Sequence, residues 1–312
     1  MSNFTFQDSF NDSVFQQVSN ELKNRVKIFC IILSTPKNKH TRAEAQKKTW
    51  LKRCNGYVYA SSKNDPSLPS IKASKNDGYR NAYVKIKNGI IWAWEKYGKM
   101  YDYYMKVDDD SYVIMENLRT FLLKKNPDSH GYYGFKLKSQ LHNGEIFDYI
   151  QGGSGYVLSR RTVALLYNKG FNNKKFCTQG LKKIDDTEIG VCMKNLGIKP
   201  HNSIDIKRKN LFSPANPSQI TSPEADASTM RFVRYTNKRY SPGMETLSDV
   251  PIAFHYVDYN MMFALEYLLY NAEIVGKSAR VLRTFDYDNV NTNIKVEKRM
   301  KLIEEFSARN YL

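Results

Sequence analysis

The stretch that decides the fold is Tyr101–Ser111, YDYYMKVDDDS, in which an aromatic and apolar run leads directly into three consecutive aspartates. The first seven residues predict a buried strand. Ligands bind beyond the carboxyl ends of strands in open α/β sheets, so Asp108, Asp109 and Asp110 lie where a site is expected. Bound Mg²⁺ or Mn²⁺ would offset the repulsion between these carboxylates. The alternative is a solvated acidic turn that caps a helix beginning near Glu116.

Two strand-and-helix pairs precede this strand. Val26–Leu33 predicts a buried strand, and Thr41–Trp50 has a helix-forming composition with Thr41 as its N-cap. Tyr57–Ala60 predicts the next strand, and Asp77–Tyr97 places apolar residues on one helix face. This β-α-β-α-β order predicts an α/β fold of the nucleotide-binding kind, with parallel strands and helices on both faces.

The second half of the chain has a mixed pattern, which predicts an antiparallel part appended to the α/β layer. A segment rich in Ser, Pro and Thr, residues 214–243, predicts an irregular loop that could cover a site. Strands are predicted at 132–135, 155–158 and 252–257, and helices at 159–167, 185–195, 261–270 and 297–306.

The composition is that of a folded, basic protein. Of 312 residues, 48 are Lys or Arg and 31 are Asp or Glu, so the net charge is 48 − 31 = +17, and 41% are hydrophobic. The basic residues form no dense block and accompany no zinc-finger spacing or RNP motif, so we expect no nucleic-acid partner. The longest apolar run, Ile28–Leu33, is far below the ~20 residues of a membrane span, and we expect no anchor within this sequence.

The four cysteines form no C-x-x-C unit, which argues against zinc and thioredoxin-like chemistry. Cys30 with Cys54 and Cys177 with Cys192 are the local pairings. Four buried free thiols are the alternative. Disulfides would place the protein in an oxidising compartment.

Three further motifs have both a structural and a functional interpretation. Asp185 and Glu188 would form a capping box at a helix start, where Asp186 could instead act as a general base. The turn Gln151–Tyr156, QGGSGY, is neither a dinucleotide fingerprint nor a P-loop. Its glycines supply positive φ angles or let a substrate approach the backbone. His255 lies at the end of an apolar strand, where it is either a buried core residue or a metal ligand.

Taken together, five stretches resemble the fringe-like β1,3-glycosyltransferase family, and within it the core 1 β1,3-galactosyltransferases. The stretches are TPKNKHTRAEAQKKTWLKRCN, YYMKVDDDSYVIMENLR, GGSGYVLSR, DDTEIGVCM and AFHYVDYNMMFALEYLLYN, which occur in the family order. The resemblance implies a GT-A fold with a Rossmann-like mixed sheet. It places the catalytic domain at residues 25–275, after an N-terminal stalk or flexible segment at 1–24 and before a C-terminal extension at 276–312.

The resemblance also implies an inverting, metal-dependent transfer of galactose from UDP-galactose to the 3-hydroxyl of GalNAc O-linked to serine or threonine. Asp108 and Asp110 match the family's metal-binding D-x-D, and His255 matches a third ligand of Mn²⁺. Asp186 matches the catalytic base. Other members act on other UDP-sugars or acceptors, and one is a non-catalytic chaperone, so both alternatives stay open.

The remaining implied contacts concern the two substrates. A GalNAc-bearing glycoprotein or glycopeptide is the expected acceptor, the Golgi lumen within the secretory pathway is the expected location, and a homodimer is an expected assembly. The residues expected to bind the donor are Thr35, Arg42, Asp77, Lys85 and Asp109, and those expected to bind the acceptor are Gly153, Ser154, Tyr156 and Tyr256.

Overall fold

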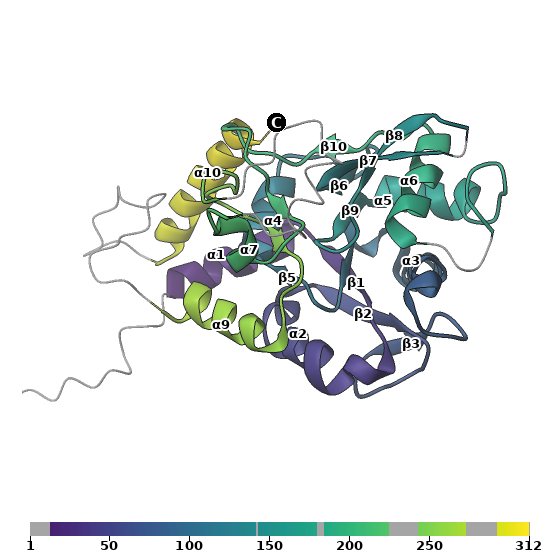
Figure 1. Ribbon diagram of the computed structural model, residues 1–312. Helices are drawn as coiled ribbons and strands as arrows, with labels where there is room; N and C mark the ends of the chain where they lie inside the picture. Colours follow the sequence, from purple (N-terminus) through teal and green to yellow (C-terminus); the bar gives the residue numbers. More distant parts are fainter. Residues whose placement is uncertain (1–12, 142, 180–183, 225–242, 273–291, 312) are drawn as a thin grey trace, which may run out of the picture.

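The first apolar run forms β1 (Ile28–Leu33), an inner strand of the main sheet (Figure 1). β1 pairs in parallel with β2 (Gly56–Ser61) and with β4 (Tyr103–Asp108), as the segment order predicts. The predicted α/β class, with a mixed sheet and helices on both faces, is confirmed. The computed structural model describes residues 13–141, 143–179, 184–224, 243–272 and 292–311.

The main sheet has the strand order β10-β6-β9-β4-β1-β2-β3 within the described residues. β9 (Tyr156–Ser159) runs antiparallel to β4 and to β6, and the other pairs are parallel. Because β9 opposes β4, the turn that precedes β9 lies beside the end of β4 that carries the aspartates. The other strands of this sheet are β3 (Ser70–Lys72), β6 (Tyr132–Gly134) and β10 (His201–Asn202).

A small second sheet brings the segment that contains His255 to the acidic turn. β12 (Ala253–Phe254) pairs antiparallel with β5 (Tyr112–Val113) and parallel with β11 (Phe212–Ser213). The predicted strand at 252–257 therefore shrinks to two residues, because the chain turns at Tyr256, whose φ is +54°. A separate hairpin joins β7 (Lys136–Gln140) to β8 (Ile146–Ile150).

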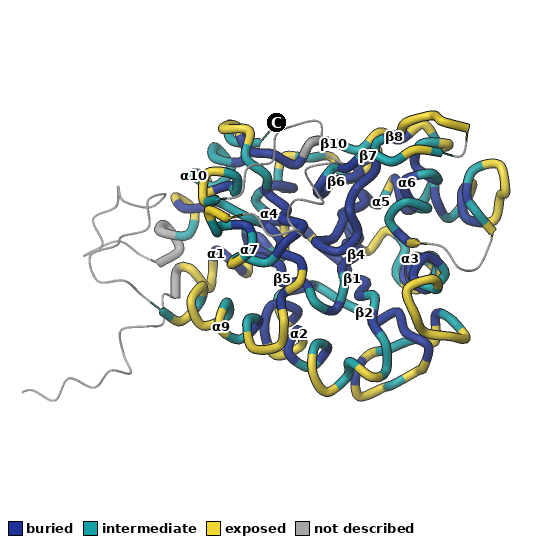
Figure 2. The backbone as a smooth tube through the Cα atoms, in the orientation of Figure 1, coloured by how far each residue is buried: buried dark blue, intermediate teal, exposed yellow. Residues whose placement is uncertain are grey.

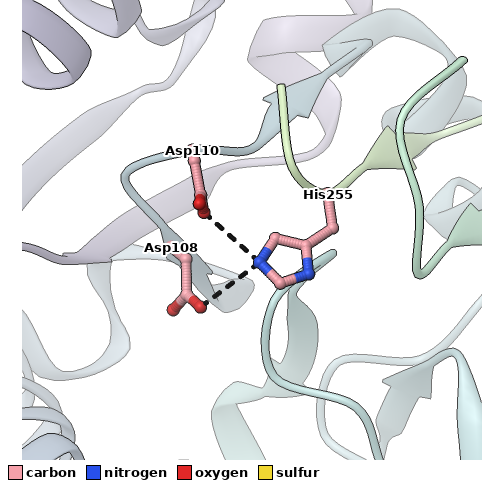
Figure 3. A group of neighbouring side chains, drawn as sticks. All are labelled: Asp108, Asp110 and His255. Carbon is pink, nitrogen blue, oxygen red and sulfur yellow. Dashed lines mark ion pairs between the residues drawn. The ribbon is translucent and has the colours of Figure 1, made fainter. Parts of the chain in front are cut away.

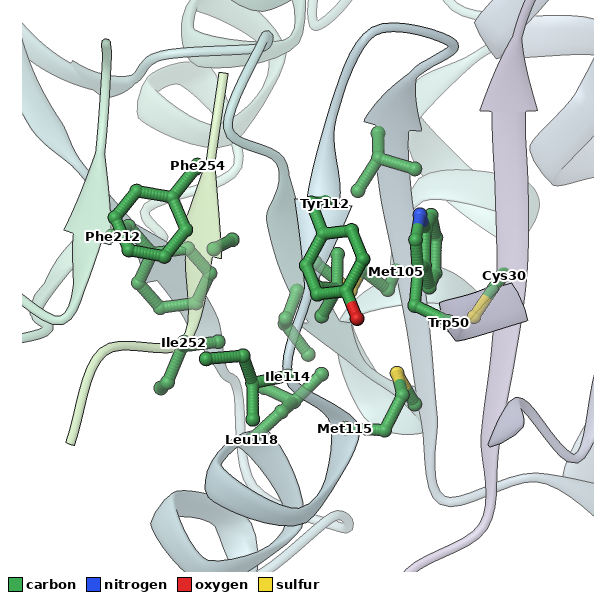
Figure 4. Packing of buried hydrophobic residues seen from close by; sticks show 14 of the residues in the cluster. Cys30, Trp50, Met105, Tyr112, Ile114, Met115, Leu118, Phe212, Ile252 and Phe254 are labelled. Carbon is green, nitrogen blue, oxygen red and sulfur yellow. The ribbon is translucent and has the colours of Figure 1, made fainter. Parts of the chain in front are cut away.

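Alternating residues of β1 enter two different cores, as the two-residue period of a strand requires. Ile28, Cys30 and Ile32 pack in the core shown in Figure 4, whereas Phe29 and Ile31 pack on the opposite face. Each large apolar side chain buried in this way contributes about 1.5 to 3 kcal/mol. The inner strands β1, β4 and β9 are accordingly buried, and most exposed residues lie on the outer helices, loops and edge strands (Figure 2).

Helices cover both faces of the main sheet (Figure 1). α3, α5 and α6 pack with the face of Phe29, and α2 and α4 pack with the face of Ile28. The helices are α1 (Ser13–Arg25), α2 (Glu44–Lys48), α3 (Ala82–Tyr97), α4 (Met115–Leu122), α5 (Arg160–Leu165), α6 (Asp185–Asn195), α7 (Pro217–Thr221), α9 (Tyr259–Tyr270) and α10 (Thr292–Asn310).

Two predicted helices differ in detail from the structure. The segment predicted as one helix at 41–50 consists of a π-helical turn, Lys39–Ala43, then α2, and then a 3₁₀ turn. α2 ends because Thr49 leaves helical geometry and its hydroxyl donates to the carbonyl of Ala45 at 2.7 Å. The helix predicted from residue 77 begins at Ala82, after Gly78 with φ +108°.

The described part of the predicted N-terminal stalk forms a helix, α1. α1 packs against α4 and α10, and it buries Val18 and Leu22 against Met300. Val18 and Leu22 lie one turn apart, so they share the buried face of the helix. Residues 1–12 lie outside the described residues, as do 225–242 of the predicted loop, and the domain boundaries at 24 and 275 stay predictions.

Both local disulfide pairings are present. Cys30 of β1 is bonded to Cys54, and Cys177 is bonded to Cys192 of α6. The alternative of four free thiols is therefore wrong. Among the described helices, none has the length and apolar composition that a membrane span requires.

Candidate active site

Side chains of α2 and of the 3₁₀ turn that follows it donate hydrogen bonds to the turn that carries the three aspartates. The Nε2 amide of Gln46 donates to the carbonyls of Asp108 and Ser111, at 2.9 and 3.1 Å. The indole of Trp50 donates to the same carbonyl of Ser111 at 3.0 Å. Gln46 and Trp50 are fully buried, so these bonds fix the backbone of the turn and leave the carboxylates free to point elsewhere.

Two of the three aspartates meet His255 in one group (Figure 3). Nε2 of His255 lies 3.3 Å from Oδ1 of Asp110 and 3.7 Å from Oδ2 of Asp108, and the three ligand atoms lie within 4.8 Å of one another. Carboxylate oxygens with one imidazole form a donor set that suits Mn²⁺. The predicted ligand residues therefore come together in a geometry that fits a divalent cation.

The pKa values of the two carboxylates are shifted in opposite directions. Burial raises the pKa of Asp108 to about 6, although the charge of Lys106 opposes the shift. Burial also acts on Asp110, but the contact with His255 and the charge of Arg42 outweigh burial and lower its pKa. Asp110 is therefore the carboxylate that remains ionised most readily, as a metal ligand must.

A glycine-rich turn forms the wall behind His255. A Cβ atom on Gly153 would lie 2.1 Å from both Cε1 and Nδ1 of the imidazole, so only glycine fits there. The side chain of Gln151 lies 3.3 Å from the same Nδ1 and can fix the orientation of the ring. The exposed Tyr256 ring stacks on the imidazole with a centroid distance of 3.8 Å.

Asp186 lies at the start of α6, on the other side of the same turn. Its Oδ2 accepts the backbone N–H of Gly152 at 3.0 Å, and its Oδ1 accepts that of Thr187 at 2.7 Å. Burial and the charge of Asp185 raise the pKa of Asp186 to about 6. A carboxylate with this pKa is matched to proton abstraction near neutral pH.

The predicted capping box at this helix start is wrong. Ile184 occupies the N-cap position without a side-chain cap, and Asp185 is already the first residue of α6. The carboxylate of Asp185 forms an ion pair with Lys106 at 2.6 Å. Pairing with a buried cation therefore prevails over capping.

The predicted donor residues surround the carboxyl end of β1. Thr35 follows β1, and its buried hydroxyl has no hydrogen-bond partner, which leaves it available to a ligand. It lines a pocket of about 100 Å³. Lys85 is buried, pairs with Asp77 and donates to the carbonyl of Ser34 at 2.9 Å. The pocket is also lined by Ser34, Pro36, Lys39, Tyr59, Ser61, Lys63, Asn64, Asp65, Leu68 and Ser70.

Asp109 organises the loop after β1. It is 5% exposed, and its carboxylate accepts hydrogen bonds from Ser34 at 2.7 Å, Asn38 at 2.8 Å and Arg42 at 3.2 Å. These donors occupy both of its oxygens, and a direct contact of Asp109 with the sugar donor stays a prediction. Arg42 also lies 3.3 Å from Asp110, and its side chain is 42% exposed. Arg42 can therefore still reach a phosphate group.

The four predicted acceptor residues separate into two groups. Ser154 and Tyr156 are fully buried, and Gly153 is buried beneath His255. An acceptor contact at these three residues stays a prediction. Their role is in building the turn: the amide and hydroxyl of Ser154 both donate to Gln151. Tyr256 alone among the four is exposed.

Two site residues were missed in the sequence. Lys106 lies in β4 and forms ion pairs with Asp108 and Asp185, and Gln151 contacts His255. Lys106 did carry a signal, because it is a charged residue within an otherwise apolar strand, where an unpaired charge is costly. Nothing in the sequence around Gln151 indicates its contact with a distant histidine.

A model of the Fringe-like family matches residues 23–262, a range that contains every residue of this site. Glycoprotein-N-acetylgalactosamine 3-beta-galactosyltransferase 1 of Xenopus laevis is 30% identical over 264 residues, covering 84% of this chain and 71% of that protein. Beta-1,3-galactosyltransferase 1 of Mus musculus is 23% identical over 240 residues, covering 64% of this chain and 72% of that protein.

Proposed function

Because this chain belongs to the Fringe-like family and is a glycosyltransferase with a GT-A fold, we propose that it transfers galactose from UDP-galactose to the 3-hydroxyl of GalNAc O-linked to serine or threonine. The names of both relatives specify transfer of galactose to a 3-position. The name of the Xenopus laevis relative also specifies a glycoprotein GalNAc acceptor. The proposal extends this donor, linkage and acceptor to the present chain.

The proposed cofactor is Mn²⁺, held by Asp108, Asp110 and His255. The bound ion would supply positive charge to the diphosphate that leaves from the donor. Arg42, which lies beside Asp110 and is partly exposed, adds a second positive charge at the same place. Thr35 is the proposed contact for the nucleotide, because its buried hydroxyl lacks a partner and lines the neighbouring pocket.

Asp186 is the proposed general base. It would remove the proton from the 3-hydroxyl of the acceptor as that oxygen attacks C1 of the sugar from the face opposite UDP. A single displacement of this kind inverts the anomeric configuration and needs no covalent intermediate. Tyr256 is the proposed acceptor contact, since its ring is exposed beside His255 and can pack on a sugar face.

One observation carries the proposal: the candidate base and a candidate metal ligand flank the same turn. Asp186 binds the amide of Gly152, and His255 packs against Gly153. A base and a leaving-group site must lie on either side of one reacting sugar. A non-catalytic, chaperone-like role would require neither the metal-binding group nor a base with a raised pKa.

The proposed location is the Golgi lumen. Its support is the pair of disulfides, which form in the oxidising environment of the secretory pathway. A homodimer stays a prediction.

The function is tested with a panel of UDP-sugars, Mn²⁺ and a GalNAc-threonine peptide, with UDP release and peptide mass as readouts. We expect peptide-dependent UDP release from UDP-galactose and a product heavier by one hexose. Transfer from another UDP-sugar, or to another acceptor, would support the alternative of a related β1,3-glycosyltransferase. Absence of transfer from every UDP-sugar by the folded protein would overturn the proposal.

A further inference from the structure

Lys106 is a buried lysine at the centre of the site. Its side chain is 1% exposed, and its ammonium group donates to Oδ1 of Asp108 at 2.7 Å and to the carbonyl of Gly152 at 3.0 Å. It also forms an ion pair with Oδ2 of Asp185 at 2.6 Å. Burying a lysine is costly unless its charge is paired, and here the ammonium group has two hydrogen-bond acceptors and a second carboxylate beside it.

The three groups that Lys106 contacts come from three separate segments of the chain. Asp108 ends β4, Gly152 belongs to the turn before β9, and Asp185 begins α6. Asp186, the proposed base, follows Asp185 and accepts the N–H of Gly152. Gly152 is therefore held at its carbonyl by Lys106 and at its amide by Asp186.

The packing around this contact leaves no room for a side chain at Gly152. A Cβ atom there would lie 2.9 Å from Nζ of Lys106, 3.1 Å from Oδ2 of Asp185 and 3.1 Å from Cβ of Asp186. Lys106 also cannot touch a substrate, because it is almost completely buried. Any effect of Lys106 on the reaction must therefore act through the residues that it holds.

We propose that Lys106 is a positioning residue that links the metal-binding end of β4 to the start of α6 and so sets where Asp186 stands relative to Asp108. It occupies Oδ1 of Asp108, which leaves Oδ2 to face His255. It occupies the carboxylate of Asp185, which fixes the first turn of α6. This inference rests on the proposed function for the role of Asp186, whereas the contacts themselves do not depend on it.

The experiment compares the wild type with Lys106→Met, Asp185→Asn and the double variant. Methionine keeps the length and apolar stem of lysine and removes its charge. In Lys106→Met, Asp108 and Asp185 face each other without a cation, so we expect lower thermal stability without metal. We also expect kcat for transfer to fall more than about 30-fold, with KM for the UDP-sugar changing less than about threefold, because Lys106 does not line the pocket beside Thr35.

Adding Asp185→Asn to Lys106→Met removes one of the two unpaired carboxylates. The double variant should therefore be more stable than Lys106→Met and should regain at least about fivefold in kcat, a non-additive result typical of residues in contact. Lys207→Met is the matched control. Lys207 forms an exposed ion pair with Asp249 at 2.7 Å, so this variant should match the wild type.

A folded Lys106→Met protein with wild-type kcat would overturn the proposal, as would strictly additive effects in the double variant. If Lys106→Met does not fold, the comparison of Asp185→Asn with the wild type tests the proposal instead. A kcat lowered about tenfold at unchanged KM would support a positioning role for Lys106. A wild-type kcat would refute it. A wild type that transfers no sugar would instead refute the proposed function. The stability measurements would then still test the coupling between Lys106 and Asp185.

Discussion

Nε2 of His255 lies 3.3 Å from Oδ1 of Asp110, although the two residues come from distant parts of the chain. The pairing of β12 with β5 brings them together, because Phe254 is the register partner of Tyr112. The amide of Val257 also donates to the carbonyl of Asp110 at 2.8 Å. The candidate metal group is thus complete only when the segment that contains His255 has paired with the strand that follows the aspartates.

The group formed by Asp108, Asp110 and His255 predicts that sugar transfer depends strictly on a divalent metal ion. We expect chelation to abolish transfer and added Mn²⁺ to restore it, with activity measured across a metal titration. His255→Ala removes one of three ligands and should raise the Mn²⁺ concentration for half-maximal activity by at least about tenfold. His40→Ala is the control, because His40 is an exposed residue paired with Glu44. An unchanged metal requirement in His255→Ala would remove His255 from the ligand set.

Replacing the proposed base should affect catalysis and spare binding. A general base contributes about 10²- to 10⁴-fold, so Asp186→Asn should lower kcat by that factor while UDP affinity stays near the wild-type value. Asparagine keeps the acceptor oxygen that can bind the amide of Gly152. Glu188→Gln, one residue past Thr187 on the same helix, controls for loss of a negative charge there. Wild-type transfer by Asp186→Asn would exclude the residue as the base.

The pH profile should report the same carboxylate. Burial and the charge of Asp185 raise the pKa of Asp186 to about 6. A base acts in its ionised form, so kcat/KM should rise as pH increases through this pKa and level off above it. At saturating Mn²⁺, which would hold Asp108 in its ionised form, we expect a slope of about one in log kcat/KM below the midpoint. A flat profile from about pH 5 to 8 would contradict this assignment.

Some parts of the fold could be predicted because their signals are local. The strand that ends at Asp108 and the helix at Asp185–Asn195 are found where the sequence places them. The two-residue and 3.6-residue periods suffice for such segments. The disulfide pairings also follow from placement, since Cys30 and Cys177 each bond to the next cysteine along the chain.

Other parts depend on tertiary contacts that no local pattern contains. One face of α1 packs against α10, and the capping expected of Asp185 gives way to an ion pair with Lys106. Tyr156, which we expected to contact the acceptor, is buried because β9, the strand that it begins, lies between two neighbouring strands. In each case, burial of a distant segment decides what a side chain does.

Gly153 should be required for the metal site. Alanine at this position would place a Cβ 2.1 Å from the His255 ring and displace it, so Gly153→Ala should weaken Mn²⁺ binding in a titration. In a His255→Ala background the ring is absent, and Gly153→Ala should then add little further loss. Equal losses in both backgrounds would show that the glycine acts by another route.

The disulfide at Cys177 and Cys192 should stabilise the helix that carries Asp186. Its cysteines are 15 residues apart, and a loop of this size corresponds to about 3 kcal/mol. We expect Cys177→Ala with Cys192→Ala to lower the free energy of unfolding by about 2 to 4 kcal/mol in urea titrations. A reductant should then lower the melting temperature of this variant less than that of the wild type. Unchanged stability would argue against a structural role.

The central claim is that one site, built by Asp108, Asp110, His255 and Asp186, carries out an inverting β1,3-transfer. The most direct test is to incubate the protein with UDP-galactose, a GalNAc-threonine peptide and Mn²⁺, and to determine the product linkage by NMR. The account predicts a β-linked galactose on the 3-hydroxyl of GalNAc, formed only when metal is present. An α-linked product, or one that forms equally well under chelation, would contradict it.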